Sequence, residues 1–495
     1  MSLGIILAKL TLWGVGGIML VFCGVMCGFW PVILNYQLKK ELILTNSSKS
    51  YNLWIETPIP MYLEIYMFNW TNPSETLQGS AKPNFLQLGP YVFSEKHKKE
   101  NLIWNTNDTI TFKQRRTWHF VPEMSKGTLS DKITNLNVIA MTVGNKISNY
   151  IKKIPPRFIP TIFAIINQIL KIEESDVFVT KSVNELLFDG YDDKFLTIAK
   201  KLEKILKYKL PFDKFGWFYN RNNSIDYDGT FNMKTGALGL DQLGDIVRWN
   251  YSPQSPSYPG HCGDIDGSSG ELWPIDAASR KSVKIFANDI CSSLILKQDG
   301  TSAMYGVKGS RFSADKNVFD NGENIPDNSC YCTKKPCPAT GARDISKCRY
   351  GAPAFISSPH FYMADSSYVA NISGMSPNPD LHNFFILLEE ITSIPLKVQA
   401  RLQINIRSEP IKGIKFYENL PYAYMPMIWF DQTASVTPDL ANELSSLVGI
   451  ASYVEPSLIG LTVVGAVMII IGLILWRLDY FTKNQEEPLI EPSTS

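Results

Sequence analysis

The chain has 495 residues, which is enough for one very large domain or for two to three domains of ordinary size. Its 48 basic residues nearly balance its 47 acidic residues, and the resulting net charge of +1 gives no reason to expect nucleic-acid binding. The hydrophobic fraction of 45% is ordinary, but the apolar residues are concentrated in two runs near the ends of the chain.

No charged side chain occurs between Leu10 and Leu34 or between Leu458 and Trp476. A helix of about 20 apolar residues crosses the hydrocarbon core of a bilayer, so both runs are predicted to span a membrane. The alternative for each run is a buried core helix, and a further alternative for the first is a cleaved signal peptide. Because its apolar part exceeds the roughly 7–15 residues typical of signal peptides, the first run is interpreted as an uncleaved anchor.

The two runs divide the chain into an N-terminal segment, a first span, a large central domain, a second span and a tail, at residues 1–9, 10–34, 35–457, 458–476 and 477–495. Charge gives little guidance to orientation, because Lys39 and Lys40 follow the first span instead of preceding it. Six glycosylation sequons all lie between the spans, at Asn46, Asn69, Asn107, Asn222, Asn250 and Asn371. They favour an extracellular or luminal central domain with both termini in the cytosol.

Six of the eight cysteines also lie in the central domain, within residues 262–348: Cys262, Cys291, Cys330, Cys332, Cys337 and Cys348. An even, clustered set is typical of disulfides in an oxidising compartment. Zinc is the alternative, but only Cys332 and Cys337 approximate the paired spacing of structural zinc sites. We therefore expect disulfides and no metal. The remaining pair, Cys23 and Cys27, lies in the first span and is interpreted as small packing residues.

The central domain is predicted to be mostly β. Residues 398–407 alternate between apolar and polar side chains without a fault, which predicts a strand with one buried face. Met61 to Trp70 and Thr109 to Phe120 alternate more loosely and are rich in aromatic residues. The sequence Asp228-Gly229 predicts a hairpin turn between apolar flanks.

Two segments have helical periodicity instead, at residues 159–170 and 195–206. The second carries many lysines on its other faces. The simple interpretation is a solvated helix face, and the functional alternative is a cationic platform for acidic ligands or anionic membranes. Under that alternative the candidate ligand-binding residues are Lys152, Lys153, Lys200, Lys201 and Lys204.

Motifs typical of catalysis are missing from the sequence. It has no G-x-S-x-G, H-E-x-x-H, P-loop or G-x-G-x-x-G pattern, and its five histidines are scattered singly. We therefore expect a protein that is not an enzyme and that needs no cofactor.

Several short motifs together resemble those of the class B scavenger receptors, a family that includes the fatty acid translocase, the lysosomal integral membrane protein and insect croquemort. These motifs are Pro31-Val32, Leu88-Gly-Pro-Tyr91, Asn184-Glu-Leu-Leu187, Cys330-Tyr-Cys332, Asp344-Ile-Ser-Lys-Cys348, Ser358-Pro-His-Phe361, Arg401-Leu-Gln403 and Ile428-Trp429. The resemblance covers nearly the whole chain. Residues 118–127 look most like the arthropod branch.

The resemblance implies an α+β membrane protein, in which two transmembrane helices flank a large antiparallel β-barrel ectodomain. It further implies an apical helical bundle at about residues 145–215 and an apolar tunnel through the barrel. The disulfides that it implies are Cys262–Cys330, Cys291–Cys348 and Cys332–Cys337.

The implied function is that of a scavenger receptor. It would bind lipids, lipoproteins or anionic ligands such as apoptotic cells, and would pass lipid through the tunnel to the membrane. The acidic segment 171–176 departs from relatives that bind oxidised lipoprotein, so ligand identity is not carried over. Glu486, Leu489 and Ile490 resemble a dileucine sorting signal. They support the alternative of a lysosomal trafficking receptor for a luminal enzyme, beside the plasma membrane as the expected location.

Overall fold

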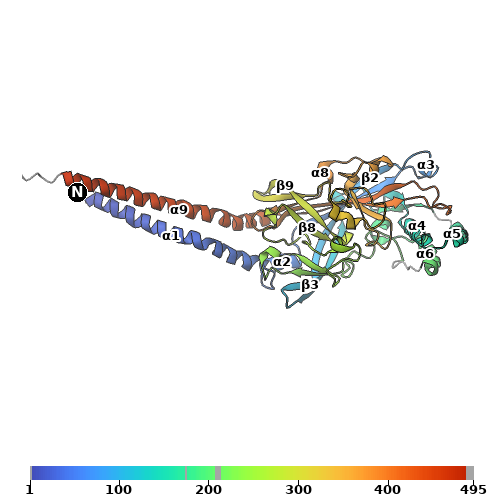
Figure 1. Ribbon diagram of the computed structural model, residues 1–495, viewed down its shortest axis with the longest axis horizontal. Helices are drawn as coiled ribbons and strands as arrows, with labels where there is room; N and C mark the ends of the chain where they lie inside the picture. Colours follow the sequence, from blue (N-terminus) through green and yellow to red (C-terminus); the bar gives the residue numbers. More distant parts are fainter. Residues whose placement is uncertain (1–2, 173–175, 207–212, 486–495) are drawn as a thin grey trace, which may run out of the picture. The chain divides into compact units, whose positions relative to one another are not determined.

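The computed structural model describes residues 3–172, 176–206 and 213–485 (Figure 1). The chain forms two compact units. One contains Met1–Leu42 and Asn442–Ser495, and the other contains Ile43–Ala441.

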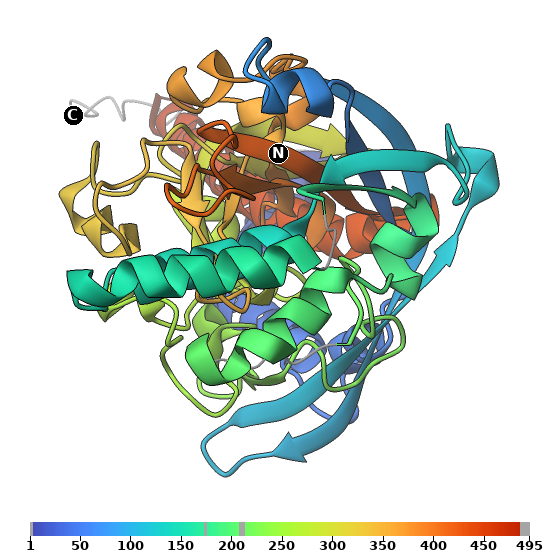
Figure 2. The ribbon, with the colours of Figure 1, turned by 90° about the vertical axis from the view of Figure 1, so that its right-hand side faces the viewer.

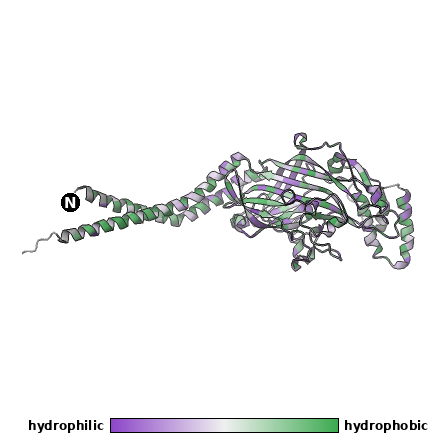
Figure 3. Cartoon of the chain, turned by 90° about the horizontal axis from the view of Figure 1, so that it is seen from above, coloured by the Kyte–Doolittle hydropathy of each residue, from purple (hydrophilic) through white to green (hydrophobic). Residues whose placement is uncertain are grey.

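The first unit is a pair of long helices, α1 (Leu3–Leu42) and α9 (Pro438–Gln485); the first residues of α9, up to Ala441, belong to the second unit. Both are apolar along most of their length (Figure 3) and are long enough to cross a membrane. They touch at two glycines, because a Cβ atom on Gly16 would lie 2.9 Å from the carbonyl oxygen of Gly465. Cys23 is buried within this unit, and both Cys23 and Cys27 are free thiols.

The second unit is built on a 13-stranded sheet that nearly closes into a barrel, with strand order β7-β6-β3-β2-β1-β15-β14-β13-β10-β9-β8. Off this path, β12 pairs with β14 and β11 pairs with β12. The strands are β1 (Met61–Trp70), β2 (Phe85–Trp104), β3 (Thr109–Phe120), β6 (Thr230–Lys234), β7 (Ile246–Trp249), β8 (Ser282–Ala287), β9 (Ser292–Met304), β10 (Val307–Ser313), β11 (Ala342–Asp344), β12 (Ala354–Ser357), β13 (Phe385–Glu389), β14 (Pro395–Ser408) and β15 (Ala423–Ser435). Ser268 bridges the two edges, pairing with Asp245 beside β7 and with Ile285 in β8.

Helices α4 (Val138–Ile151), α5 (Ile159–Ile172) and α6 (Lys194–Leu206) gather over one end of this sheet (Figure 2), beside the small sheet of β4 (Lys132–Leu136) and β5 (Phe178–Ser182). Helix α4 packs against α6. The remaining helices are short: α2 (Lys49–Ile55), α3 (Pro73–Leu77), α7 (Ser367–Ala370) and α8 (Pro379–His382).

The predictions of two apolar terminal helices and of an antiparallel β ectodomain are confirmed. The expected strands at 61–70 and 109–120 match β1 and β3 residue for residue, and the two expected helices match α5 and α6 within two residues. Helix α4 was not predicted. Its residues from Val138 to Asn145 are all buried, so no polar face reveals its period.

The prediction that β14 has a single buried face is wrong. Its polar side chains Arg401, Gln403 and Asn405 are buried as well, because the turn at Pro359–Phe361 and the backbone around Asp380 lie against that side of the strand. Hydrogen bonds compensate the buried polar groups for the loss of water. The backbone N–H of His360 donates to Gln403 at 2.7 Å, and Asn405 donates to Ser357 at 2.9 Å.

The Asp228-Gly229 hairpin is also wrong. The turn comes before β6, but β6 pairs with β3 and β7 and not with a strand on the other side of the turn. Gly229 has a φ of +83°, as such a turn requires, while Asp228 is buried and takes part in ion pairs.

Candidate functional site

A cavity of about 270 Å³ lies inside the second unit, on the apolar side of β14. Its volume is near the lower end of the roughly 300–1,000 Å³ typical of small-molecule sites. Strands β12, β14 and β15 supply one apolar wall, which includes Leu402, Ile404 and Phe430. Helix α4 contributes Val138 and Ile139 to another wall, so the unpredicted helix helps to enclose the cavity.

The segment between α6 and β6 completes the enclosure. Its aromatic side chains Trp217 and Phe218 line the cavity, and the backbone N–H groups of both residues donate to the carbonyls of Leu186 and Leu187 at 2.8 Å. These hydrogen bonds hold the segment against the π-helical turn Glu185–Asp189, which contains part of the predicted Asn-Glu-Leu-Leu motif.

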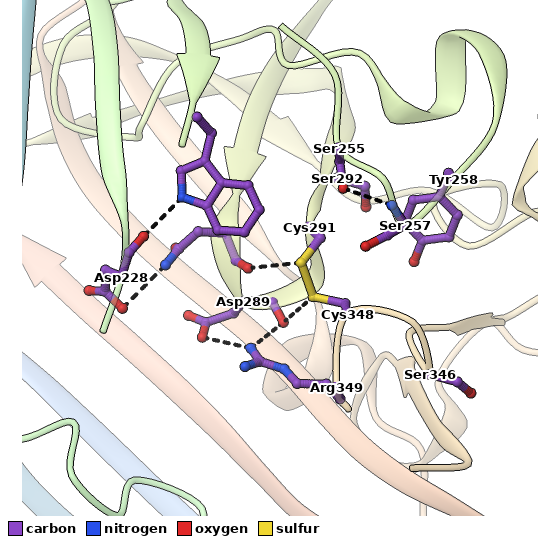
Figure 4. Close-up of a disulfide and its surroundings, with 12 residues drawn as sticks. Asp228, Ser255, Ser257, Tyr258, Asp289, Cys291, Ser292, Ser346, Cys348 and Arg349 are labelled. Carbon is purple, nitrogen blue, oxygen red and sulfur yellow. Dashed lines mark hydrogen bonds and ion pairs between the residues drawn. A yellow bond between two sulfur atoms is a disulfide. The ribbon is translucent and has the colours of Figure 1, made fainter. Parts of the chain in front are cut away.

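One end of the cavity is charged. Arg116, Arg221, Asp289 and Arg349 line it together. Asp289 forms ion pairs with Arg221 at 2.9 Å and with Arg349 at 3.1 Å. Figure 4 shows Asp289 and Arg349 beside the disulfide of Cys291 and Cys348. Burial alone would raise the pKa of Asp289, but the guanidinium groups of Arg221, Arg116 and Arg349 hold it well below its ordinary value.

Asp228 joins this group from the turn before β6. It lies 2.8 Å from Arg221 and 2.8 Å from the Nε of Arg116, and Figure 4 shows it near Asp289. Each buried cation in this group therefore has a carboxylate partner, as buried charges require.

A second buried chain of charges continues from Glu95 along β2. The imidazole of His97 lies between two carboxylates, 2.7 Å from Glu95 and 2.9 Å from Glu271, and Lys99 lies 2.5 Å from Glu271. Burial would lower the pKa of His97, but the two carboxylates raise it above its ordinary value. Burial would raise the pKa of Glu271, and Lys99 and His97 instead lower it to about 2.

This second chain connects two apolar regions. Glu95 lines the cavity, whereas the ammonium group of Lys99 lies 5.8 Å from the ring of Trp54. Trp54 belongs to a separate apolar cluster with Leu44 and Phe112, close in sequence to the end of α1. The charged residues Glu95, His97 and Lys99 thus stand between the cavity and this cluster.

Sequence reasoning missed both charged groups. Along Ser94-Glu-Lys-His-Lys-Lys-Glu100 every residue is polar, so the two faces of the strand cannot be told apart. The partners Asp228, Asp289 and Arg349 are far apart in the chain, and only the fold brings them together. No signal in one sequence could have found them.

The predicted cysteine pairs are all present as disulfides in the structure, at Cys262–Cys330, Cys291–Cys348 and Cys332–Cys337. They are the pairs that the family resemblance implies. His261 lies beside the Cys262–Cys330 disulfide. Both sulfur atoms there are bonded to each other, so they are not thiolates that could bind zinc.

The predicted glycosylation sites differ in exposure. Five of the asparagines are exposed, namely Asn46, Asn107, Asn222, Asn250 and Asn371. Asn69 is half-buried on β1, and its side-chain oxygen accepts a hydrogen bond from the N–H of Thr134 at 2.7 Å. Glycosylation at all six stays a prediction.

Of the predicted ligand-binding lysines, Lys152, Lys153 and Lys200 are exposed on the helical end of the ectodomain. The side chains of Lys201 and Lys204 lie outside the described residues, as does the sorting segment with Glu486, Leu489 and Ile490. The structure does not bring the described lysines to the barrel cavity.

A nearly closed barrel that contains an apolar cavity with one charged end, joined to two helices long enough to cross a membrane, is the architecture of a membrane-anchored binding protein. The model of the CD36 family matches residues 14–476. Protein peste of Drosophila melanogaster is 33% identical over 437 residues, which cover 87% of this chain and 77% of that protein. Scavenger receptor class B member 1 of Cricetulus griseus is 31% identical over 482 residues, covering 96% and 89%. Sensory neuron membrane protein 2 of Manduca sexta is 26% identical over 468 residues, covering 89% and 88%.

The chain therefore belongs to the CD36 family, as the sequence motifs predicted. It is a membrane protein of the scavenger receptor type and not an enzyme.

Proposed function

We propose that this protein is a receptor for lipids and lipid-bearing particles, and that a lipid released from them occupies the barrel cavity on its way to the membrane. The observation that carries this proposal is the composition of the cavity. The cavity walls formed by β14 and β15 are apolar. The opposite end of the cavity is formed by cationic and acidic side chains that surround Asp289. An amphiphile with one acyl chain and one anionic head group matches both parts.

Burial of apolar surface favours a position of the acyl chain on the apolar wall. Each CH₂ group removed from water contributes about 0.8 kcal/mol, so even a short alkyl chain gains several kcal/mol there. For the head group, Arg221 is already paired with Asp228 and Asp289. Lys214 also lines the cavity and is half-buried, which makes it the better partner for a carboxylate.

Passage toward the membrane would follow the barrel axis as a tunnel. Support for this route comes from the second apolar cluster around Leu44 and Trp54, which lies beyond the charged residues of β2. An acyl chain in transit must displace or skirt His97 and Lys99. The route therefore includes a polar step.

The helical end is the proposed surface for larger ligands. Helix α5 exposes Ile165, and Phe158 just before it is 48% exposed. Lys152, Lys153 and Arg157 are exposed near its beginning. Apolar side chains beside cations suit the surface of an anionic lipid particle.

We further propose that residues 35–457 face the cell exterior or an organelle lumen, with both termini in the cytosol and the plasma membrane as the main location. The three disulfides and the five exposed sequon asparagines support an oxidising, glycosylating compartment.

Lipid binding can be tested with a substitution that fills the cavity. Ile404→Trp places a bulky ring in the apolar wall, whereas Ile295→Trp adds the same ring on β9, where Ile295 is 46% exposed. The full-length proteins are purified in detergent, and their bound lipids are extracted and quantified by mass spectrometry. We expect at least a tenfold loss of bound lipid in Ile404→Trp and no loss in Ile295→Trp. Equal lipid content in both variants would contradict the proposal.

A further inference from the structure

A second hollow, of about 340 Å³, opens on the ectodomain away from the barrel cavity and shares none of its lining residues. Its lining contains four cationic side chains and one carboxylate. The cations are Lys152, Lys334, Lys335 and Arg407, and the carboxylate is Glu409.

The fold holds these cations in place from three directions. The Cys332–Cys337 disulfide closes the short loop that carries Lys334 and Lys335. Arg407 comes from β14, and Lys152 directly follows α4. The loop is anchored further where Lys334 donates to the side-chain oxygen of Asn145 at 3.3 Å.

Their charges are poorly compensated. The one carboxylate of the lining, Glu409, lies 3.5 Å from Arg407 and so compensates that charge, which leaves the charges of the three lysines uncompensated. Within the described parts of the chain, no carboxylate oxygen comes within 4.0 Å of the amines of Lys152, Lys334 or Lys335. Burial lowers the pKa of Lys334, and the nearby charges of Arg407 and Lys152 lower it further, against the opposing effect of Asp344 and Glu409. Holding cations together in this way costs free energy that a bound anion would recover.

We propose that this hollow is a binding site for a phosphate-type oxyanion, supplied as inorganic phosphate or as the head group of an anionic phospholipid. Lysine ammonium groups and the planar fork of Arg407 are the usual partners of phosphate oxygens. The amide of Asn149 adds a neutral hydrogen-bonding group, and Pro336 and Tyr422 give the rim an apolar part. The site is independent of the lipid cavity and would serve to dock an anionic ligand on the outside of the ectodomain.

The experiment titrates the full-length protein in a neutral detergent by isothermal calorimetry at constant ionic strength. The two probes are inorganic phosphate and the short-chain lipid dihexanoyl phosphatidic acid. The test variant is Lys334→Gln with Lys335→Gln. The matched control is Lys308→Gln with Lys316→Gln, which removes the same charge at two exposed positions elsewhere. Asn371 also lines the hollow, so all proteins carry Asn371→Gln to exclude a glycan there.

We expect the test variant to weaken binding of at least one probe tenfold or more and the control to change it less than twofold. The single variant Lys152→Gln, at an exposed position, should weaken binding by a smaller factor without affecting folding. Tighter binding of the lipid than of inorganic phosphate would identify the head group as the ligand, and equal or weaker binding would identify the free ion.

Two results would overturn the proposal: no measurable binding of either probe, or equal weakening in the test and control variants. Ile404→Trp should bind both probes normally, so failure of the barrel-cavity proposal would leave this site unaffected.

Discussion

The buried carboxylate of Glu271 offers the sharpest test of the ionic chain inside the barrel. Glu271→Gln removes the negative charge that faces both Lys99 at 2.5 Å and His97 at 2.9 Å. The side chain of Lys99 is fully buried, and burial already lowers its pKa, so without Glu271 the ammonium group is left without this partner or must lose its proton. We therefore expect a large loss of stability from this nearly isosteric change.

The magnitude follows from the burial. Removing one partner of a buried ion pair costs about 3–5 kcal/mol, because the other charge is left uncompensated in a medium of low dielectric constant. A solvent-exposed pair contributes only about 0–1 kcal/mol. For an ectodomain of this size, a loss of 3–5 kcal/mol corresponds to a fall of roughly 3–10 °C in apparent melting temperature.

The assay is thermal unfolding of the full-length protein in detergent at pH 7, followed by intrinsic tryptophan fluorescence at one fixed heating rate. Asp266→Asn is the matched control, because Asp266 pairs with Lys284 at 2.6 Å on the surface, where both side chains are more than 40% exposed. The double variant Glu271→Leu with Lys99→Met removes both charges and should recover much of the loss.

If Glu271→Gln lowered the melting temperature no more than Asp266→Asn does, the buried ion pair would not be the source of the stability. The same conclusion would follow if the double variant were less stable than Glu271→Gln alone, since the cost would then not come from an unpaired charge.

Two further predictions concern other parts of the chain. The stacked imidazoles of His360 and His382 are buried, and burial lowers their pKa values to about 4 and about 3. Both values lie below the pKa of about 6.5 in the unfolded chain. The stability contributed by the neutral imidazoles is therefore complete above pH 6.5 and is lost as the pH falls. We expect the melting temperature to drop between pH 7 and pH 5, and to drop less in His382→Gln; an equal drop in that variant would contradict the assignment. In the helix pair, Gly465→Ile should lower the apparent melting temperature, because a Cβ atom there would lie 2.8 Å from the carbonyl oxygen of Gly16. A Cβ atom at Gly460 meets no atom within 4 Å, so Gly460→Ile should have no effect. Similar melting temperatures of the two variants would exclude the glycine contact.

The sequence predicted those elements whose two faces differ chemically. Strands β1 and β3 and helices α5 and α6 carry one apolar face, and their periods could be recognised. Helix α4 is buried on all sides from Val138 to Asn145, and β14 is buried on both faces around Gln403. In these elements the alternation of apolar and polar residues therefore does not show which side is exposed.

The candidate site could be predicted only in part. The apolar alternation of β14 correctly indicated Leu402 and Ile404 as inward-facing, and they line the cavity. The buried ionic chain could not be predicted, because Glu95, His97 and Lys99 lie in a sequence that looks like an ordinary exposed charged segment. Their partner Glu271 comes from the segment beside Ser268 that bridges the sheet edges, a contact that depends on the closure of the whole barrel.

Whether the barrel cavity carries lipid can be measured by photo-crosslinking with a fatty acid that bears a diazirine on its acyl chain. The full-length protein is labelled in detergent, and the modified peptides are identified by mass spectrometry. We expect labels on β14, β15 and the segment that contains Trp217, and we expect these labels to be lost in Ile404→Trp but not in Ile295→Trp. Labels confined to α1 and α9, with none on the peptides that line the cavity, would contradict this expectation.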